Sequence, residues 1–330
     1  MIEAVGLTAV TIGGAFMEKL IDWLLAGDAA VRWQTMRDLL DAPEQAWQAE
    51  RQRTAISGWG AQFLALQEPS GQWGGGIYSP KWVSTTYTLL TLCDIGLPGD
   101  CEAARRGAEL AVSSLLGPTC DDAFYRKLAA LDRCIVGMML RIGINYNIDK
   151  TRIEGIVANL LQEMMPDGAW NCRRNRRPTP HHSSFHTTFN VLEGMHAYLA
   201  WGQGAQYEAV LAAQQSALSF MLEHHLFLSD KTGEVVNPKF TYFSFPTRWF
   251  YDVLRGLSYF ALVDAPRDAR LQEAMDVLHG RRRKDGTWPV QNKHSGRVFF
   301  DMEKTGGPSR WNTLRALRVL RWWNGELAAV

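Results

Sequence analysis

The sequence has little cysteine, little net charge and no long apolar run, and each shortage excludes a class of protein. Five cysteines among 330 residues are too few and too unevenly spaced for a disulfide framework, so we expect reduced thiols and a cytoplasmic protein. A formal net charge of +1 does not favour a nucleic-acid or membrane-surface partner. Apart from the apolar N-terminus, no segment is long, apolar and uncharged enough to predict an integral membrane segment.

The N-terminus indicates where the folded domain begins, and the scarcity of strand patterns indicates its fold class. Residues 1–16 are apolar but contain Glu3 and lack a basic start, which makes a poor signal peptide. We expect these residues to be an N-terminal extension or the result of a misassigned start, with Met17 opening the folded part. Residues 17–330 are then expected to form a single domain. Because β-branched runs with period two are scarce, we expect this domain to be all-α.

A short turn in which Gly stands two residues before Trp occurs three times. It reads LQEPSGQWGGG at 66–76, LQEMMPDGAWNC at 161–172 and RRRKDGTWPVQN at 281–292. Each copy follows an amphipathic stretch that is typical of a helix and precedes a stretch rich in apolar and small residues. The Gly lets the backbone turn tightly, and the indole is expected to pack against the helix ends.

Five apolar stretches that are typical of buried helices recur along the chain, at 84–97, 132–144, 185–201, 247–262 and 310–323. Aligning them places Ser84, Asp132, His186 and Arg248 at equivalent positions. A helix that is apolar on all sides must be buried. Alternating exposed and buried helices therefore predict a ring, an (α/α)5–6 toroid, to which 18–40 adds two further helices. An open helical solenoid is the alternative.

The repeated turn resembles the QW motif of squalene–hopene and oxidosqualene cyclases, with Gln67, Gly71 and Trp73 as its fullest copy. From about residue 44 onward the chain is similar to the superfamily of toroids that contains these cyclases and the protein prenyltransferase β subunits. The cyclases protonate their substrate with an Asp-x-Asp-Asp motif. The nearest segment here, TCDD at 119–122, lacks the first Asp, so a protonation-driven cyclase is not expected.

The prenyltransferase β subunits hold a catalytic zinc with an Asp-x-Cys pair on one inner helix and a His on the next. Asp132 and Cys134 match the pair, and His186 matches the His in a Phe-His-Thr-Thr setting. The resemblance therefore implies a Zn²⁺ site formed by these three residues, with a fourth position open as in catalytic zinc sites. Residues two apart do not share a helix face, so the pair converges only if a helix begins at Asp132. A capping Asp, a buried Cys and a core His are the alternative reading.

Other polar residues near the predicted helix starts are candidates for catalysis. His182 lies with His181 and Cys172 on the loop that leads to His186, and one of the three could replace a metal ligand or act as an acid or base. Tyr251 and Asp252 are candidate acid/base residues, provided that they face the ring cavity.

Several residues are candidates for binding the substrate. Arg126 stands six residues before Asp132, where the prenyltransferases have a diphosphate-binding Arg, so the resemblance implies that role. Arg173 and Arg174 begin a basic run that suits phosphate or carboxylate, with a solvated loop as the alternative. Aromatic side chains near inner-helix starts are expected to line a cavity that suits an apolar ligand. Phe185 and Trp249 are the aromatic candidates, and Arg248, near the same kind of helix start, is a further candidate.

Taken together, these patterns favour a zinc-dependent enzyme that acts on a small lipophilic molecule, for instance an isoprenoid with an anionic head. The reaction would be of transferase, lyase or hydrolase type. A zinc hydrolase using metal-bound hydroxide and a non-catalytic toroid that binds a ligand or protein stay open as alternatives. Whether a partner subunit is needed also stays open. A carbohydrate-active (α/α)6 enzyme fits less well, because few acidic residues lie at inner-helix starts.

Overall fold

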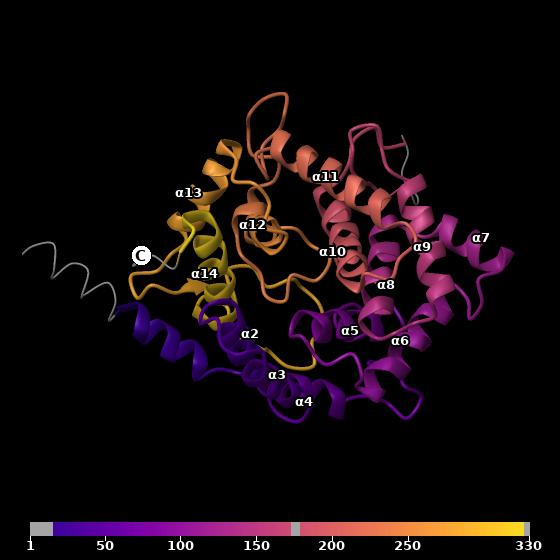
Figure 1. Cartoon of the computed structure of the whole chain (residues 1–330), viewed down its shortest axis with the longest axis horizontal. Helices are drawn as coiled ribbons and strands as arrows, with labels where there is room; N and C mark the ends of the chain where they lie inside the picture. The colour runs from indigo at the N-terminus through magenta and orange to yellow at the C-terminus, as the bar shows by residue number, and fades with distance from the viewer. Residues whose placement is uncertain (1–15, 173–178, 327–330) are drawn as a thin grey trace, which may run out of the picture.

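The structure is a computed structural model that describes residues 16–172 and 179–326. The helices form a closed ring of inner and outer helices (Figure 1). The protein is therefore an all-α toroid, as the repeat pattern predicts. The expectations for residues 1–15 and for Arg173 and Arg174 lie outside the described residues.

Inner and outer helices alternate along the described part of the chain. The inner ring consists of α2 (Ala29–Asp38), α5 (Thr85–Asp94), α8 (Arg133–Asn145), α10 (Phe185–Trp201), α12 (Val253–Leu262) and α14 (Arg310–Asn324). Outside it lie a helix at 16–25, α3 (Glu44–Gln52), α4 (Gly58–Ala65), α6 (Glu102–Leu115), α7 (Asp122–Ala130), α9 (Lys150–Gln162), α11 (Tyr207–Glu223) and α13 (Gln272–Gly280). The short elements are η1 (Arg53–Ala55), η2 (Pro238–Thr241), η3 (Ala269–Leu271), and strands β1 (Trp288–Pro289) and β2 (Pro308–Ser309), which pair antiparallel.

Burial separates the two rings. On α5 every residue from Thr85 to Leu92 is buried, because this helix is covered on all sides. On α3 no residue is buried, and polar side chains cover most of its surface. The difference follows from the sequence, since an apolar helix has to be enclosed while an amphipathic one can face water.

The ring is closed where the two ends of the described chain meet, which excludes the open solenoid. Helix α14 packs against α2 (indigo beside yellow in Figure 1), and Arg318 on α14 donates to the side chain of Gln34 on α2 at 2.6 Å. The next junction is held by Trp33 on α2, whose indole N–H donates at 3.0 Å to the carbonyl of Ile95 at the end of α5. The residues at 18–40 therefore complete the ring as a sixth helix pair.

The three Gly-x-Trp turns share one hydrogen-bond pattern. In each, the indole N–H donates at 2.7 Å to a carbonyl ten residues earlier, at the end of the preceding outer helix: Trp73 to Phe63, Trp170 to Leu160 and Trp288 to Leu278. The backbone N–H of each Trp donates to a Thr hydroxyl on the following inner helix: Thr85, Thr188 and Thr313. Each turn therefore fastens an outer helix to the start of an inner one.

The glycine of each turn adopts a backbone conformation that other residues avoid. Gly71, Gly168 and Gly286 have φ angles of 89°, 88° and 80°. Residues with a Cβ are strained in this left-handed region, which explains why Gly recurs two residues before Trp.

The predicted alignment of inner-helix starts was wrong for two of its four members. Ser84 and Asp132 do precede α5 and α8, but the residues that precede α10 and α12 are Ser184 and Asp252 rather than His186 and Arg248. The physical reason is capping. The side chain of Asp252 accepts a hydrogen bond from the backbone N–H of Arg255 at 2.8 Å, and the apolar pattern alone does not reveal this start.

Within the described residues, no helix combines the length and apolar character that crossing a membrane requires.

Candidate metal centre and central cavity

The start of α8 is fixed by the residue that follows Asp132. The guanidinium of Arg133 folds back and donates to the carbonyls of Leu128 and Ala129, at 2.7 and 3.1 Å, in the last turn of α7. These carbonyls have no partner within their own helix, and a cation there is favourable. The chain therefore breaks between α7 and α8, and Asp132 becomes the residue that precedes α8, as convergence with Cys134 requires.

Two glycines bring α8 close to α10. A Cβ added to Gly137 would lie 2.5 Å from the carbonyl oxygen of Asn190, and one added to Gly194 would lie 2.6 Å from the carbonyl oxygen of Gly137. Both distances are shorter than atoms allow, so only glycine permits this approach. As a result, the first turn of α8 lies near the segment that leads into α10.

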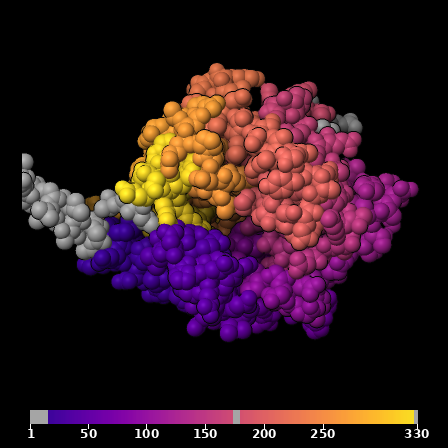
Figure 2. Space-filling view, in the orientation of Figure 1, coloured from indigo at the N-terminus to yellow at the C-terminus, as the bar shows by residue number. Residues whose placement is uncertain are grey.

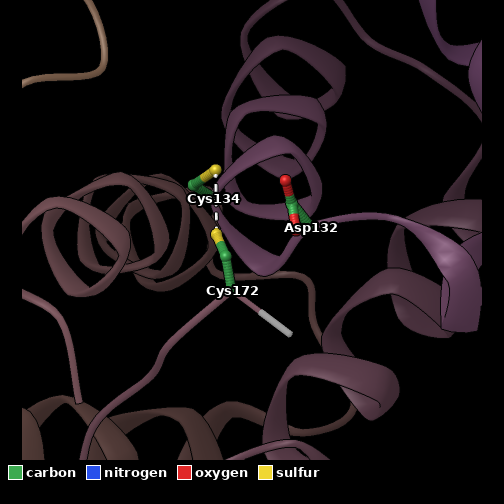
Figure 3. A group of neighbouring side chains, drawn as sticks. All are labelled: Asp132, Cys134 and Cys172. Atoms are coloured by element: carbon green, nitrogen blue, oxygen red, sulfur yellow. Dashed lines mark hydrogen bonds between the residues drawn. The ribbon is translucent and has the colours of Figure 1, made fainter. Parts of the chain in front are cut away.

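Asp132, Cys134 and Cys172 meet at this place and form what we call the Asp–Cys–Cys cluster. Their ligand atoms lie within 4.8 Å of one another. Asp132 and Cys134 project from the start of α8, and Cys172 approaches from the loop that follows the second Gly-x-Trp turn (Figure 3). The two sulfurs are 3.2 Å apart and share a hydrogen bond, and the Sγ of Cys172 also lies 3.2 Å from the hydroxyl oxygen of Thr187.

The two thiols of the cluster titrate differently. The hydrogen bond with Cys134, helped by Thr187, lowers the pKa of Cys172 to about 7. The same hydrogen bond and burial raise the pKa of Cys134 well above its usual value. At neutral pH the pair can therefore carry one negative charge, held mainly by Cys172.

Tyr78 is a neighbour of the cluster that the sequence did not single out. Burial raises the pKa of its hydroxyl to about 12, and the nearby Cys134, Asp132 and Cys172 add to this effect. Its hydroxyl lies 2.9 Å from that of Tyr87 on α5. Tyr78 thus stays a neutral hydrogen-bonding group beside the cluster. Its position soon after the first Gly-x-Trp turn was the available signal, because Cys172 also follows such a turn, although Tyr78 is five residues beyond its Trp and Cys172 is two residues beyond its own.

His186 lies near the start of α10 but outside the Asp–Cys–Cys cluster. Its Nδ1 accepts a hydrogen bond from the backbone N–H of Tyr251 at 2.8 Å. Its ring meets the rings of Trp249, Phe240 and Phe250 edge-on, with centroids 5.2, 5.4 and 5.6 Å away. Among the described residues the third ligand-bearing side chain that meets Asp132 and Cys134 is Cys172, one of the three loop residues considered as substitutes.

The predicted acid/base residues Tyr251 and Asp252 form hydrogen bonds within the described chain. Tyr251 is buried, and its hydroxyl donates to the carbonyl of Leu226 at 2.7 Å. Asp252 is also buried, which raises its pKa, and its carboxylate accepts from the backbone N–H groups of Arg255 and of Ser244, the latter at 2.9 Å. Neither is among the described residues that line the cavity of about 660 Å³ in the middle of the ring, and their acid/base role stays a prediction. His182 is exposed on the loop before α10.

The aromatic residues expected to line a cavity instead pack on one another. Phe185 is buried among other rings, including those of Tyr251 and Phe240, with both centroids 5.3 Å away. Trp249 stacks on Phe250 with centroids 3.9 Å apart. Arg248 donates to the hydroxyl of Thr91 at 3.2 Å, and burial lowers its pKa to about 10.

Arg126, expected to bind diphosphate, lies on α7 at the outer edge of the ring in Figure 1. Its side chain is exposed, so it takes no part in the ring interior. That role stays a prediction.

A cavity of about 660 Å³ occupies the middle of the ring, and we call it the central cavity. Every inner helix contributes to its wall, for example through Gln34, Asp94, Arg141, Glu193, Arg255 and Arg315. Figure 2 shows the surface hollowed near the middle of the ring. The cavity extends to the last turns of α2, α12 and α14 and to Arg267 beyond α12. It therefore reaches the C-terminal ends of these inner helices, whereas the Asp–Cys–Cys cluster lies at an N-terminal end.

The wall of the central cavity is highly charged, which the sequence analysis did not anticipate. Among the described residues it contains seven arginines and five carboxylates: Arg37, Arg141, Arg255, Arg267, Arg315, Arg318, Arg321, Asp38, Asp41, Asp94, Glu193 and Asp264. The available signal was the single charges that interrupt apolar stretches, such as Arg141 in MMLRIGI and Glu193 in NVLEGM.

Toward the helix starts the ring interior narrows. A space of about 10 Å³, lined by Tyr87, Thr91 and Arg248, shares Arg255 and Glu193 with the central cavity. A space of this size holds about one water molecule.

No known protein family and no curated protein matches the sequence. Among solved structures, the fold is similar to that of a variant of the type II terpene cyclase MstE from Scytonema, in complex with its substrate geranylgeranyl dihydroxybenzoate. The two chains are 14% identical, with a TM-score of 0.38, and the match covers 92% of this chain and 88% of the other.

Proposed function

We propose that the chain is a zinc-dependent enzyme whose metal ligands are Asp132, Cys134 and Cys172. The observation that carries the proposal is the convergence of one carboxylate and two sulfurs within 4.8 Å. Carboxylate and thiolate are ligands that zinc prefers, and three protein ligands leave a fourth position for water or substrate. A bound zinc would supply a Lewis acid, or lower the pKa of a group that it binds.

The donor set fits a tetrahedral zinc ion with little rearrangement. Zinc–sulfur and zinc–oxygen bonds of about 2.0–2.3 Å place tetrahedral ligands roughly 3.3–3.8 Å apart. The two sulfurs, at 3.2 Å, need to separate by about half an ångström, and donor atoms at the 4.8 Å limit need to approach each other by about 1 Å. The backbone N–H groups and dipole at the start of α8 favour the negative charge of both Asp132 and Cys134.

The substrate that we propose is a small lipophilic molecule with an anionic head, of which an isoprenoid is one class. Aromatic side chains gather at the same end of the inner helices as the cluster: Trp82 precedes α5, and Trp249 and Phe250 precede α12. The ammonium group of Lys81 lies 5.3 Å from the ring centroid of Trp249, which adds positive charge beside these rings. Transfer of a group to or from such a molecule is the reaction type that we favour over hydrolysis.

Metal analysis of purified protein tests the proposal. We expect about one zinc per chain in the wild type and a loss of most of it in Cys172→Ser, because the ion loses one of three protein ligands. Cys101→Ser is the matched control, since this thiol precedes α6 away from the cluster. A wild-type protein without zinc, or full zinc content in Cys172→Ser, would contradict the proposal.

The variant His186→Ala decides between a catalytic and a structural metal. If zinc content stays unchanged, the ion has three protein ligands and an open position, as we propose. If His186→Ala and Cys172→Ser both lose zinc, the ion has four protein ligands, which is typical of structural sites. The enzyme proposal would then fail although the metal site stands.

A further inference from the structure

Most arginines of the central cavity already have a carboxylate partner in its wall. The ion pairs join Arg141 to Asp94 and Glu193, Arg255 to Glu193, Arg37 and Arg318 to Asp38, and Arg321 to Asp41. These pairs neutralise their members and hold neighbouring helices together. They are therefore poor candidates for binding an additional anion on their own.

Arg315, on α14, differs from these paired residues. Only 8% of it is exposed. Within residues 16–172 and 179–326 its terminal nitrogen NH1 is buried without a hydrogen-bond partner. The nearby carboxylates have other partners: Glu193 accepts from Arg255 at 2.7 Å, and Asp252 accepts from backbone N–H groups. Arg315 thus brings a buried positive charge to the cavity wall, which Asp252, Asp94 and Glu193 offset from nearby without a hydrogen bond to its NH1.

Leaving a buried guanidinium nitrogen without a hydrogen-bond partner lowers the stability of the folded protein. A buried donor without a partner costs about 1–3 kcal/mol, and a charged one costs more. Arg267 adds to the positive excess, because its only hydrogen bond within the described residues goes to the carbonyl of Trp322, at 2.8 Å. Arg315 and Arg267 are therefore the two arginines of the cavity wall that form no ion pair with a described carboxylate.

We propose that the central cavity binds a small organic anion, with its carboxylate or phosphate group placed against Arg315. A guanidinium presents donors in a planar fork that matches either group. The volume of about 660 Å³ lies in the range of ordinary small-molecule sites. Trp311 and Phe245, stacked with centroids 4.7 Å apart, also line the cavity and offer a surface for the apolar body of the ligand.

This anion site does not depend on the proposed zinc. Arg315, Trp311 and Phe245 line the central cavity. The described residues that line it do not include Asp132, Cys134 or Cys172. Arg126, on the outer face of the ring, is the anion site that the sequence resemblance implied. The two arginines therefore make competing predictions about where an anion binds.

Titration calorimetry of the full chain at low ionic strength tests the site, with phenyl phosphate and phenylacetate as the two probes. We expect at least one probe to bind, and the stronger of the two identifies the preferred head group. Arg315→Met is expected to weaken that binding roughly 10- to 100-fold, the usual effect of losing a charged hydrogen bond. Arg126→Gln serves as the control and is expected to bind as the wild type does.

The melting temperature distinguishes a binding role of Arg315 from a structural one. Because Arg315→Met removes a buried charge that lacks a partner, we expect its melting temperature to equal or exceed that of the wild type. Arg315→Lys keeps the charge without the fork and is expected to bind with intermediate affinity. The proposal is overturned if neither probe binds, if Arg315→Met binds unchanged, or if Arg315→Met loses its fold.

Discussion

The two ends of the inner helices use different chemistry. At the N-terminal ends, indoles donate to carbonyls, hydroxyls and carboxylates cap helices, and two thiols meet an aspartate. Toward the C-terminal ends, arginines and carboxylates face one another across the central cavity. The first set of contacts joins inner helices to outer ones and so builds the ring, whereas the second set lies inside it. Substitutions at the starts should therefore affect stability first, and substitutions in the cavity should affect binding or the response to pH.

The largest effect is expected at a Gly-x-Trp turn. Trp170→Ala should lower the free energy of unfolding by about 3–5 kcal/mol, because it leaves a cavity in the core and removes the hydrogen bond to Leu160. Urea denaturation measures the change. Trp201→Ala, at the half-buried end of α10, is the control and should be less costly. Equal losses in the two variants would show that the turn does not fasten the ring.

A smaller effect, dependent on pH, is expected inside the cavity. The guanidinium groups of Arg255 and Arg141 outweigh burial and hold the pKa of Glu193 at about 2, below its ordinary 4.5. A lowered folded-state pKa stabilises the protein above pH 4.5, and this stability is lost as the pH falls toward 2. Glu193→Gln should therefore lower the free energy of unfolding at pH 7 by about 3 kcal/mol.

Urea denaturation at pH 7, 5 and 3 checks this prediction. The wild type should lose stability between pH 5 and pH 3 more steeply than Glu193→Gln does, since the variant lacks the titrating group. If the two proteins lose stability in parallel, other carboxylates carry the acid sensitivity, and the cavity ion pairs do not differ in pH response from the rest of the molecule.

Much of the ring could be predicted from the sequence because its signals are local. The Gly-x-Trp turns and the buried apolar stretches each depend on residues a few positions apart. The start of α8 at Asp132 was required for the predicted site, and the structure has it there. The starts of α10 and α12 were misplaced, because apolar periodicity indicates burial but does not identify the capping residue.

The side chains inside the ring were harder to predict, because their surroundings depend on the direction in which each side chain points and not only on whether it is buried. Phe185 and Trp249 were expected to line a cavity, but apolar side chains near helix starts can equally pack on one another, and these do. Cys172 was only one of three loop candidates, since no sequence spacing indicates that the second turn approaches α8. The charged cavity was missed because a single charge in an apolar stretch, such as Arg315, is informative only once the helices are placed around a ring.

The smallest effect is expected at the helix starts, where the same substitution can be compared at two positions. Ser309 and Ser84 precede α14 and α5, and both side chains are fully buried. The hydroxyl of Ser309 accepts from the backbone N–H of Asn312 at 2.9 Å and donates to Glu303. The hydroxyl of Ser84 has no partner among the described residues. The same substitution at equivalent positions therefore removes a capping hydrogen bond in one helix and an unsatisfied hydroxyl in the other.

We expect Ser309→Ala to lower the free energy of unfolding by about 1–2 kcal/mol, the usual cost of losing a helix cap. Ser84→Ala should leave it unchanged or raise it slightly, because a buried hydroxyl without a partner is itself unfavourable. Urea denaturation of the two variants side by side measures the difference. A loss at Ser84 as large as that at Ser309 would mean that the hydroxyl of Ser84 is satisfied by a group outside the described chain, such as a bound water. In that case the helix starts would owe their stability to solvent as well as to the caps and turns of the chain.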